Sequence, residues 1–311
     1  MIIILMKALR LSAVVLSLLL VATGCSAPAA GSGTGKLNVV VAFYPLQYVV
    51  QQVGGDQVNV TSLTQPGVEP HDLELTARQV AAVGSADLVF YERGFQAAVD
   101  SAVDTQTPKR VLDGATIVPL RTTPGFTGES ATPDPSTSAL DPHTWLDPQT
   151  MIKYASAVAA QLAQARPAAA TDFQTRADAL VKELTTLDTE FSAGLASCQR
   201  TVFVTSHAAF GYLAERYGLE QVGIAGLTPD AEPTPSRLAE VQKIAQQKGV
   251  TTIFSETLAS PALANALASD LGLKTDVLDP LEGITSSSRG TDYPSVMRSN
   301  LTALRTANGC Q

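Results

Sequence analysis

Short apolar runs alternate with amphipathic segments along most of this chain, and that alternation constrains the fold more than any other feature of the sequence. Runs with the length and composition of buried strands cover 38–43, 58–63, 87–91, 201–205, 221–224, 250–255 and 274–278. Helical patterns separate neighbouring runs, as they do in parallel α/β units, and one long interval divides the runs into two sets. We therefore predict an α/β fold with two lobes, each containing a mostly parallel sheet flanked by helices.

The segment between the two sets is predicted to form one long helix that bridges the lobes. It has no internal proline after Pro167, and apolar residues recur every three or four positions, at Phe173, Ala177, Leu180, Leu184, Leu187, Phe191 and Leu195. At 1.5 Å per residue this helix is about 45 Å long. The predicted organisation is an N-terminal lobe over 37–166, the bridging helix over 167–196 and a C-terminal lobe over 197–311.

The start of the chain has the composition of an export signal. Lys7 and Arg10 form a short basic stretch, and the apolar run over 11–22 that follows is interrupted only by two serines. This run is too short to span a membrane, and it ends in small residues. Residues 1–24 are therefore predicted to be a signal peptide.

Cys25 is predicted to be a site of lipid attachment. The stretch Val21-Ala-Thr-Gly-Cys25 resembles a bacterial lipobox, in which the Cys is acylated and becomes the first residue of the mature chain. A Cys in an ordinary cleaved signal is the alternative. The residues that follow Cys25 are small or Pro, so 25–36 is predicted to be the lipidated Cys and a flexible tether. The expected location is the outer face of the cell membrane.

Two other cysteines and the net charge narrow the classes of function. Cys198 and Cys310 form an even pair in a chain predicted to be exported, where a disulfide is more common than a metal or catalytic site. Such a bond would close a loop of about 110 residues.

The net charge is −8, and an acidic chain is a poor candidate for nucleic-acid binding.

The three histidines of the chain point to one candidate metal site. His71 and His207 follow predicted strands, His143 precedes a well-capped helix start at Asp147-Pro148, and Asp279 follows the last predicted strand. Ligands of open α/β sheets bind at the carboxyl ends of the strands. Imidazoles with one carboxylate suit Zn²⁺, and four protein ligands are typical of binding rather than catalysis. No short His-x-His spacing supports a metal locally, so histidines in the core or on the surface remain an alternative.

Several ordered motifs resemble one family of bacterial receptors. They are Ala42-Phe-Tyr-Pro-Leu-Gln47 with Gly54-Gly-Asp56, Glu69-Pro-His-Asp-Leu-Glu74, Ser85-Ala-Asp-Leu-Val-Phe90, Asp141-Pro-His-Thr-Trp-Leu-Asp-Pro148, Thr205-Ser-His-Ala-Ala-Phe-Gly-Tyr212 and Glu232-Pro-Thr-Pro-Ser236. Over about residues 37–285 the chain resembles the zinc- and manganese-binding lipoproteins of bacterial ABC importers, the ZnuA/TroA-like family. The resemblance implies two α/β lobes bridged by one long helix, in agreement with the pattern above.

The resemblance also implies a set of metal ligands. His71, His143 and His207 match the first three ligands of the family, and Asp279 matches the acidic fourth, with Glu282 as a weaker candidate for that role. A His at the third position is similar to the zinc subgroup, whereas manganese receptors often have Glu there. Imidazole also favours Zn²⁺ over Mn²⁺. Zn²⁺ is therefore the expected metal, with Mn²⁺ as the alternative.

Other residues near these positions carry secondary predictions. Pro70 stands where some family members have a ligand Glu, and the Pro/Ser/Thr-rich segment over 122–139, predicted to be an exposed loop, lacks the His-rich tract of many zinc receptors. Trp145 is predicted to be a packing residue close to the site. Glu256, at the end of a predicted strand, is a candidate to orient a ligand His, or else a plain helix-start acid.

The sequence thus predicts an extracytoplasmic, lipid-anchored, monomeric receptor that captures Zn²⁺ between two lobes and delivers it to the permease of an ABC importer without catalysis. A manganese receptor of the same family is the first alternative. A secreted zinc hydrolase would instead need water at the fourth ligand position and a base such as Glu69 or Glu256. An adhesin with a structural metal would share every feature of the sequence and differ in its partners.

Overall fold

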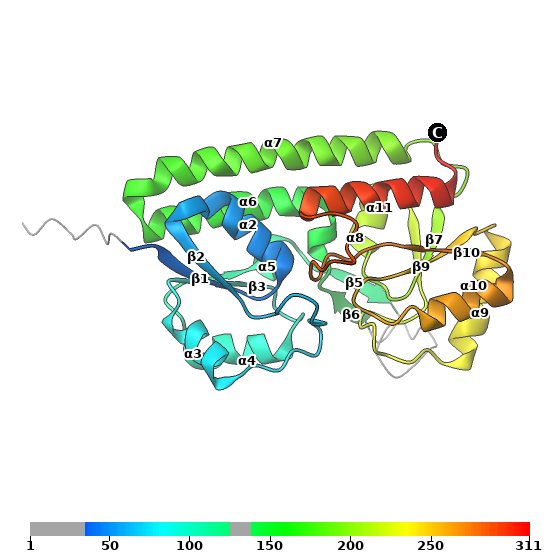
Figure 1. Cartoon of the computed structure of the whole chain (residues 1–311), viewed down its shortest axis with the longest axis horizontal. Helices are drawn as coiled ribbons and strands as arrows, with labels where there is room; N and C mark the ends of the chain where they lie inside the picture. Colours follow the sequence, from blue (N-terminus) through cyan, green and yellow to red (C-terminus); the bar gives the residue numbers. More distant parts are fainter. Residues whose placement is uncertain (1–34, 125–137) are drawn as a thin grey trace, which may run out of the picture. The chain divides into compact units, whose positions relative to one another are not determined.

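Two four-stranded parallel sheets form the framework of the chain (Figure 1). The first has the order β2-β1-β3-β4 and comprises β1 (Leu37–Val41), β2 (Val58–Ser62), β3 (Leu88–Tyr91) and β4 (Val111–Asp113). The second has the order β10-β9-β7-β8 and comprises β7 (Val202–Thr205), β8 (Glu220–Gly223), β9 (Thr252–Ser255) and β10 (Lys274–Val277). The predicted α/β class with parallel sheets is confirmed.

The computed structural model describes residues 35–124 and 138–311. Residues Lys36–Gln311 form one compact unit. The predicted signal peptide, the candidate lipidation site Cys25 and nearly all of the tether lie outside the described residues, as does most of the predicted loop over 122–139. In the described part of the chain no helix is both long enough and apolar enough to cross a membrane.

The predicted loop begins and ends in strands that pair with each other. β5 (Arg121–Pro124) and β6 (Ser138–Asp141) form a small antiparallel sheet, with Arg121 opposite Asp141. The Tyr212 hydroxyl donates a hydrogen bond to the Asp141 carbonyl and accepts one from the Arg121 backbone N–H. Tyr212 belongs to the second half of the chain, so this pair of strands contacts both halves.

Helices flank the two sheets and include the long helix expected from the sequence. The α-helices are α2 (Tyr44–Gly54), α3 (Ala77–Ser85), α4 (Ala97–Gln106), α5 (Gly114–Ile117), α6 (Pro148–Ala165), α7 (Ala170–Leu195), α8 (Gly211–Arg216), α9 (Pro235–Gln247), α10 (Ala262–Leu271) and α11 (Tyr293–Asn308). Single 3₁₀ turns are η1 (Gly55–Gln57), η2 (Thr144–Leu146) and η3 (Pro167–Ala169). The sequence predicted one helix over 167–196, whereas the structure has the 3₁₀ turn η3 followed by the α-helix α7 in this range.

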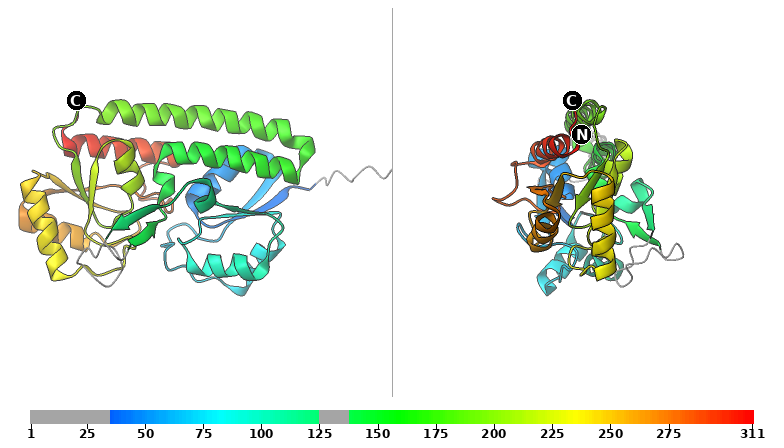
Figure 2. Two further views of the ribbon diagram at one scale, coloured as in Figure 1. Left: turned by 180° about the vertical axis from the view of Figure 1, so that it is seen from behind. Right: turned by 90° about the vertical axis from the view of Figure 1, so that its right-hand side faces the viewer.

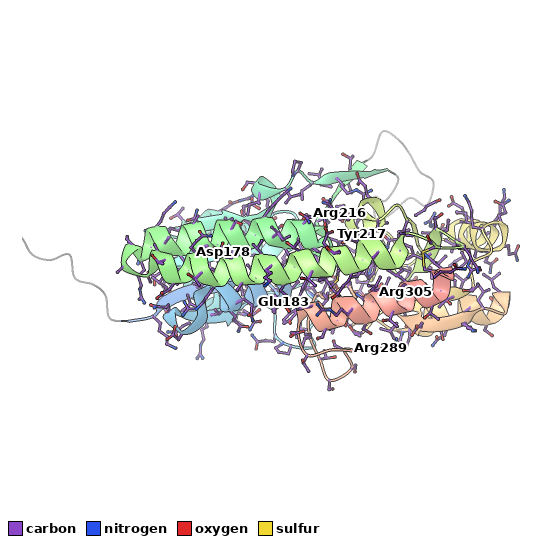
Figure 3. All side chains as sticks on the ribbon, turned by 90° about the horizontal axis from the view of Figure 1, so that it is seen from above. Asp178, Glu183, Arg216, Tyr217, Arg289 and Arg305 are labelled. Carbon is purple, nitrogen blue, oxygen red and sulfur yellow. A yellow bond between two sulfur atoms is a disulfide. The ribbon has the colours of Figure 1, made fainter. Side chains whose placement is uncertain are left out.

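Helix α7 packs against helices from both halves of the chain. The apolar stripe expected from the sequence, from Phe173 to Leu195, is buried throughout. It contacts α2 and α6 of the first half and α11 of the second, so that α7 runs alongside α6 over one part of its length and alongside α11 over another (Figures 1 and 2). Arg216 and Tyr217, at the end of α8, also lie against this layer (Figure 3). Tyr217 stacks on Phe191, and its hydroxyl donates a hydrogen bond to Asp188.

Two apolar cores hold these elements together. The larger core runs from the first sheet through α2, α6 and α7 into the second half, where it includes Phe203, Phe210 and Leu281. The smaller core lies on the second sheet and includes Val204 and Ile253. Because interiors are close-packed and resist local displacement, the shared larger core holds the loops of the two halves at a defined separation.

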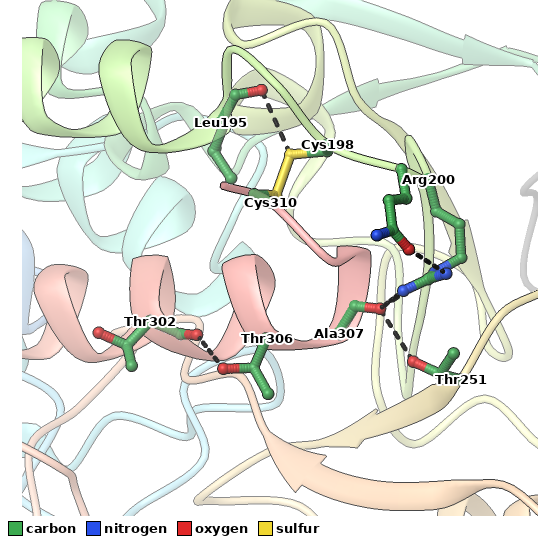
Figure 4. The surroundings of a disulfide bond; sticks show 9 residues. Leu195, Cys198, Arg200, Thr251, Thr302, Thr306, Ala307 and Cys310 are labelled. Atoms are coloured by element: carbon green, nitrogen blue, oxygen red, sulfur yellow. Dashed lines mark hydrogen bonds between the residues drawn. A yellow bond between two sulfur atoms is a disulfide. The ribbon is translucent and has the colours of Figure 1, made fainter.

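A disulfide joins Cys198, just after α7, to Cys310, just after α11 (Figure 4). The same end of α11 is held by hydrogen bonds to the Ala307 carbonyl from the Thr251 hydroxyl and the Arg200 guanidinium. The end of the chain is therefore tied both covalently and by hydrogen bonds to the second half of the molecule.

Candidate metal centre

Three imidazoles and one carboxylate meet between the two halves of the chain. The Nε2 atoms of His71, His143 and His207 lie 3.2, 3.5 and 3.4 Å from the Oε1 atom of Glu282. The Nε2 atoms of His143 and His207 lie 3.4 Å from each other. Each residue offers one ligand atom, and all four atoms lie within 4.8 Å of one another. This cluster could hold a single metal ion.

The elements of the fold explain why these side chains meet. His71 lies in the loop after β2, His207 directly follows β7, and Glu282 lies in the turn after β10. The carboxyl ends of parallel strands are where such sheets bind ligands. His143 lies between β6 and η2 and thus comes from the small sheet that contacts both halves. Each half supplies two members of the cluster.

Asp279, the acid expected at the fourth position, lies outside the cluster, and Glu282 takes its place. The Asp279 carboxylate accepts a hydrogen bond of 2.8 Å from the backbone N–H of Leu281, so it closes its own turn. Asn300 of α11 holds the same residue by accepting from its N–H and donating to its carbonyl. Glu282, three residues later, projects among the imidazoles. In this structure the turn geometry thus brings Glu282 rather than Asp279 to the three imidazoles.

The turn that presents Glu282 has an unusual backbone. Leu281 has φ of 59°, in the left-handed region that non-glycine residues seldom adopt. Such a conformation costs on the order of 1–3 kcal/mol and persists only where the surroundings enforce it. Leu281 is fully buried in the larger core, which supplies that constraint. Packing therefore determines the direction of the Glu282 side chain.

Most separations within the cluster are close to those of a tetrahedral ion. Zn²⁺ binds imidazole nitrogen and carboxylate oxygen at about 2.0–2.1 Å, which separates neighbouring ligand atoms of a tetrahedron by about 3.3–3.4 Å. The three distances from Glu282 Oε1 to the imidazoles and the distance between His143 and His207 are 3.2–3.5 Å and fall around this value. The distances from His71 to the other two imidazoles are within 4.8 Å.

The site is buried, and its ionisable groups shift one another's pKa values. His143 and His207 are fully buried, and Glu282 is 2% exposed. Burial alone would raise the pKa of Glu282, but hydrogen bonds from the three imidazoles hold it well below its usual range. Burial likewise opposes charge on His207, yet the carboxylates of Glu256 and Glu282 raise its pKa to about 10. A metal that binds through His207 must therefore displace a proton from it.

Two further carboxylates lie beside the buried histidines. Asp141 Oδ1 lies 2.9 Å from His143 Nδ1 and accepts from the His143 backbone N–H. Glu256 Oε1 lies 2.7 Å from His207 Nδ1, without hydrogen-bond geometry between these two atoms, and accepts from the His207 backbone N–H. A proton held at Nδ1 leaves the lone pair of Nε2 free for a metal. Glu256 thus lies beside the ring for which the sequence suggested an orienting acid, and its role stays a prediction. Asp141 was missed, although the short Asp-x-His spacing was a signal for it.

We expect the variant Glu256→Gln to bind Zn²⁺ about 10–100-fold more weakly than the parent chain, because loss of the carboxylate charge 2.7 Å from His207 Nδ1 makes this imidazole a weaker metal ligand. Competition titration against a chromophoric chelator measures this difference. Glu220→Gln, which alters an exposed carboxylate 3.9 Å from Lys248, serves as the control and should leave the affinity unchanged. Equal affinity of Glu256→Gln and the parent chain would show that Glu256 does not orient the histidine.

Two α/β halves that enclose a small buried site between them are the architecture of a solute-binding protein, here with a donor set suited to a metal ion. Residues 39–307 match the family model described as zinc-uptake complex component A, periplasmic. The chain therefore belongs to this family, in agreement with the resemblance seen in its motifs.

Named relatives agree with this assignment. The chain is 39% identical over 278 residues to a zinc-binding lipoprotein AdcA of Streptococcus pneumoniae. The matched region covers 87% of this chain and 56% of the relative. It is 33% identical to the high-affinity zinc uptake system protein ZnuA of Bacillus subtilis, with 89% of each chain covered. The chain thus spans about half the length of the AdcA relative and most of the ZnuA relative.

Solved structures show the same fold. The Zn(II)-bound ZnuA-like domain of Streptococcus pneumoniae AdcA is 39% identical, with a TM-score of 0.73 and coverage of 88% of this chain and 99% of that domain. A laminin-binding protein of Streptococcus agalactiae, described as bifunctional with adhesin and metal transporting activity, is 31% identical with a TM-score of 0.77. It covers 87% of this chain, and this chain covers 99% of it.

Proposed function

We propose that this protein is an extracytoplasmic zinc receptor that binds one Zn²⁺ through His71, His143, His207 and Glu282 and delivers it to the permease of an ABC importer. The observation that carries the proposal is the convergence of the four ligand atoms within 4.8 Å of one another, with Glu282 Oε1 3.2–3.5 Å from each imidazole nitrogen, which suits tetrahedral coordination. Zn²⁺ in related chains of the same family adds support.

The donor set favours zinc over manganese. Three imidazole nitrogens and one carboxylate oxygen are borderline ligands that suit Zn²⁺, whereas Mn²⁺ prefers more oxygen donors in octahedral arrangements. His143, His207 and Glu282 are buried from solvent, which disfavours an octahedral ion that would keep additional waters. We therefore propose Zn²⁺ as the cargo.

The geometry also argues for capture and release rather than catalysis. A zinc hydrolase keeps one coordination position for water, and here Glu282 reaches that position from within 3.5 Å of each imidazole. Glu69, considered as a base from the sequence, instead uses both carboxylate oxygens to accept from the His71 backbone N–H. We propose that the protein catalyses no reaction.

The anchor and the partner follow from sequence and family. The lipobox-like stretch that ends at Cys25, the tether after it, and lipoprotein relatives support attachment to the outer face of the cell membrane. A receptor held there by a tether can reach a permease in the same membrane. We propose that the protein acts as a monomer, since both halves of the site come from one chain.

Zinc should stabilise the purified, chelator-stripped protein. An ion that binds only the folded state at a hundred times its Kd contributes about 2.7 kcal/mol to the free energy of unfolding. Thermal unfolding at graded free Zn²⁺ and Mn²⁺ concentrations, with metal analysis of the recovered protein, measures this effect. We expect a rise in Tm at much lower Zn²⁺ than Mn²⁺ and one zinc per chain. A Tm independent of Zn²⁺, or a response to Mn²⁺ alone, would refute the zinc assignment.

A further inference from the structure

The one tryptophan of the chain connects the two halves of the metal site. Trp145 lies in η2, two residues after His143, and its side chain is fully buried. The indole N–H donates a hydrogen bond of 2.8 Å to the carbonyl of Pro280, which precedes Glu282 by two residues. A single side chain therefore ties the backbone beside one candidate ligand to the backbone beside another, 135 residues apart in sequence.

The indole has little freedom to move. Its ring packs edge-on against Phe43 at 4.6 Å and Phe95 at 5.0 Å between ring centroids. The backbone carbonyl of Trp145 accepts a hydrogen bond of 2.6 Å from the Tyr293 hydroxyl, at the start of α11. The position predicted from the sequence to be a packing residue is thus also a hydrogen-bonded junction between the halves.

The turn that receives this hydrogen bond depends on outside support. Leu281 holds a left-handed backbone conformation between Pro280 and Glu282. Asn300 holds the turn from the side of α11, and Trp145 holds it from the side of the first half. Loss of the indole hydrogen bond would remove the support that the turn receives from the first half at the Pro280 carbonyl.

We propose that Trp145 is a positioning residue that sets the separation of His143 and Glu282, now 3.5 Å between Nε2 and Oε1, and so holds the site to four-coordinate geometry. The proposal rests on the zinc-receptor function above and adds a determinant of metal selectivity to it. A site held to tetrahedral spacing disfavours ions that require six ligands. When the constraint is lost, the ligand atoms can separate and water can enter the coordination shell.

The single tryptophan permits a test that changes one polar group. Expression in a tryptophan auxotroph supplied with benzothienylalanine replaces the indole N–H of Trp145 with sulfur and keeps the size of the bicyclic ring. Trp145→Phe is a second, genetically encoded variant. Tyr217→Phe is the matched control, since it removes a hydrogen bond to Asp188, which is not a member of the site.

Co²⁺ substitution reports coordination number directly, because four-coordinate Co²⁺ absorbs visible light more strongly than five- or six-coordinate Co²⁺. We expect the benzothienylalanine protein and Trp145→Phe to show weaker visible bands than the parent chain. We also expect Zn²⁺ affinity to fall about tenfold or more, as for other groups that hold metal ligands, with a smaller preference for Zn²⁺ over Mn²⁺. Tyr217→Phe should keep the parent spectrum and preference.

The outcomes separate this proposal from the zinc-receptor assignment. A parent-like spectrum and an unchanged Zn²⁺/Mn²⁺ preference in both Trp145 variants would overturn the positioning role and leave the receptor assignment standing. A parent chain that binds neither Co²⁺ nor Zn²⁺ would overturn the receptor assignment and with it this proposal. A loss of Tm in the variants without any spectral change would assign Trp145 to packing alone and would also overturn the positioning role.

Discussion

Replacing Glu282 with Gln should weaken Zn²⁺ binding by more than about 100-fold, a larger loss than is usual for a group that merely supports a metal ligand. The substitution keeps the shape of the side chain but removes the one carboxylate among the described residues that lies within 3.5 Å of all three imidazole Nε2 atoms. In a site this buried, the lost attraction between carboxylate and dication is not replaced by solvent. Isothermal titration with a competing chelator provides the measurement.

Asp279→Asn is the matched variant, because it makes the same chemical change three residues earlier. Its side-chain oxygen can still accept from the Leu281 N–H, so the turn should keep its form. We expect a loss of Zn²⁺ affinity below about tenfold, the lower limit for groups that support a ligand. Thermal unfolding of both metal-free variants controls for altered stability. A larger loss of Zn²⁺ affinity in Asp279→Asn than in Glu282→Gln would show that Asp279 is one of the metal ligands.

Removal of the disulfide should destabilise the protein by about 2–5 kcal/mol. Cys198 and Cys310 are 112 residues apart, and in the chain-entropy model a loop of this size contributes about 4–5 kcal/mol by restricting the unfolded chain. Urea unfolding of the double variant C198S/C310S, compared with the oxidised parent, measures the difference. Hydrogen bonds to Ala307 from Thr251 and Arg200 remain and should keep α11 docked in the folded state.

The single variants and the metal site supply the controls for this prediction. C198S and C310S each lose the same bond, so the double variant should be no less stable than either one. Zn²⁺ affinity of the folded double variant should stay close to that of the parent, because neither cysteine contacts a member of the site. Unchanged unfolding in urea would contradict the prediction and show that the bond adds nothing to the hydrogen bonds around it.

The sequence by itself determined the class of the fold and three of the four candidate ligands. Strand and helix formation depend on neighbours a few residues away, so periodicity located three strands of the first sheet, the four strands of the second and the buried stripe of α7. It missed the short edge strand β4. His71, His143 and His207 were identifiable because they are scarce and follow strands or precede a capped helix. Helix α11 was not predicted from the sequence, although the capping box at Asp292 is a local signal for the start of a helix.

Only the tertiary structure decided which acid completes the site and what holds it there. Asp279 and Glu282 are equivalent in residue chemistry and differ by three positions, and the choice depends on the left-handed Leu281 and the Asn300 side chain from another element. The hydrogen bond from Trp145 to Pro280 has no local signature, because it joins segments 135 residues apart. Contacts of this kind form when the two halves pack on a common core, and they cannot be predicted from the periodicity of the sequence.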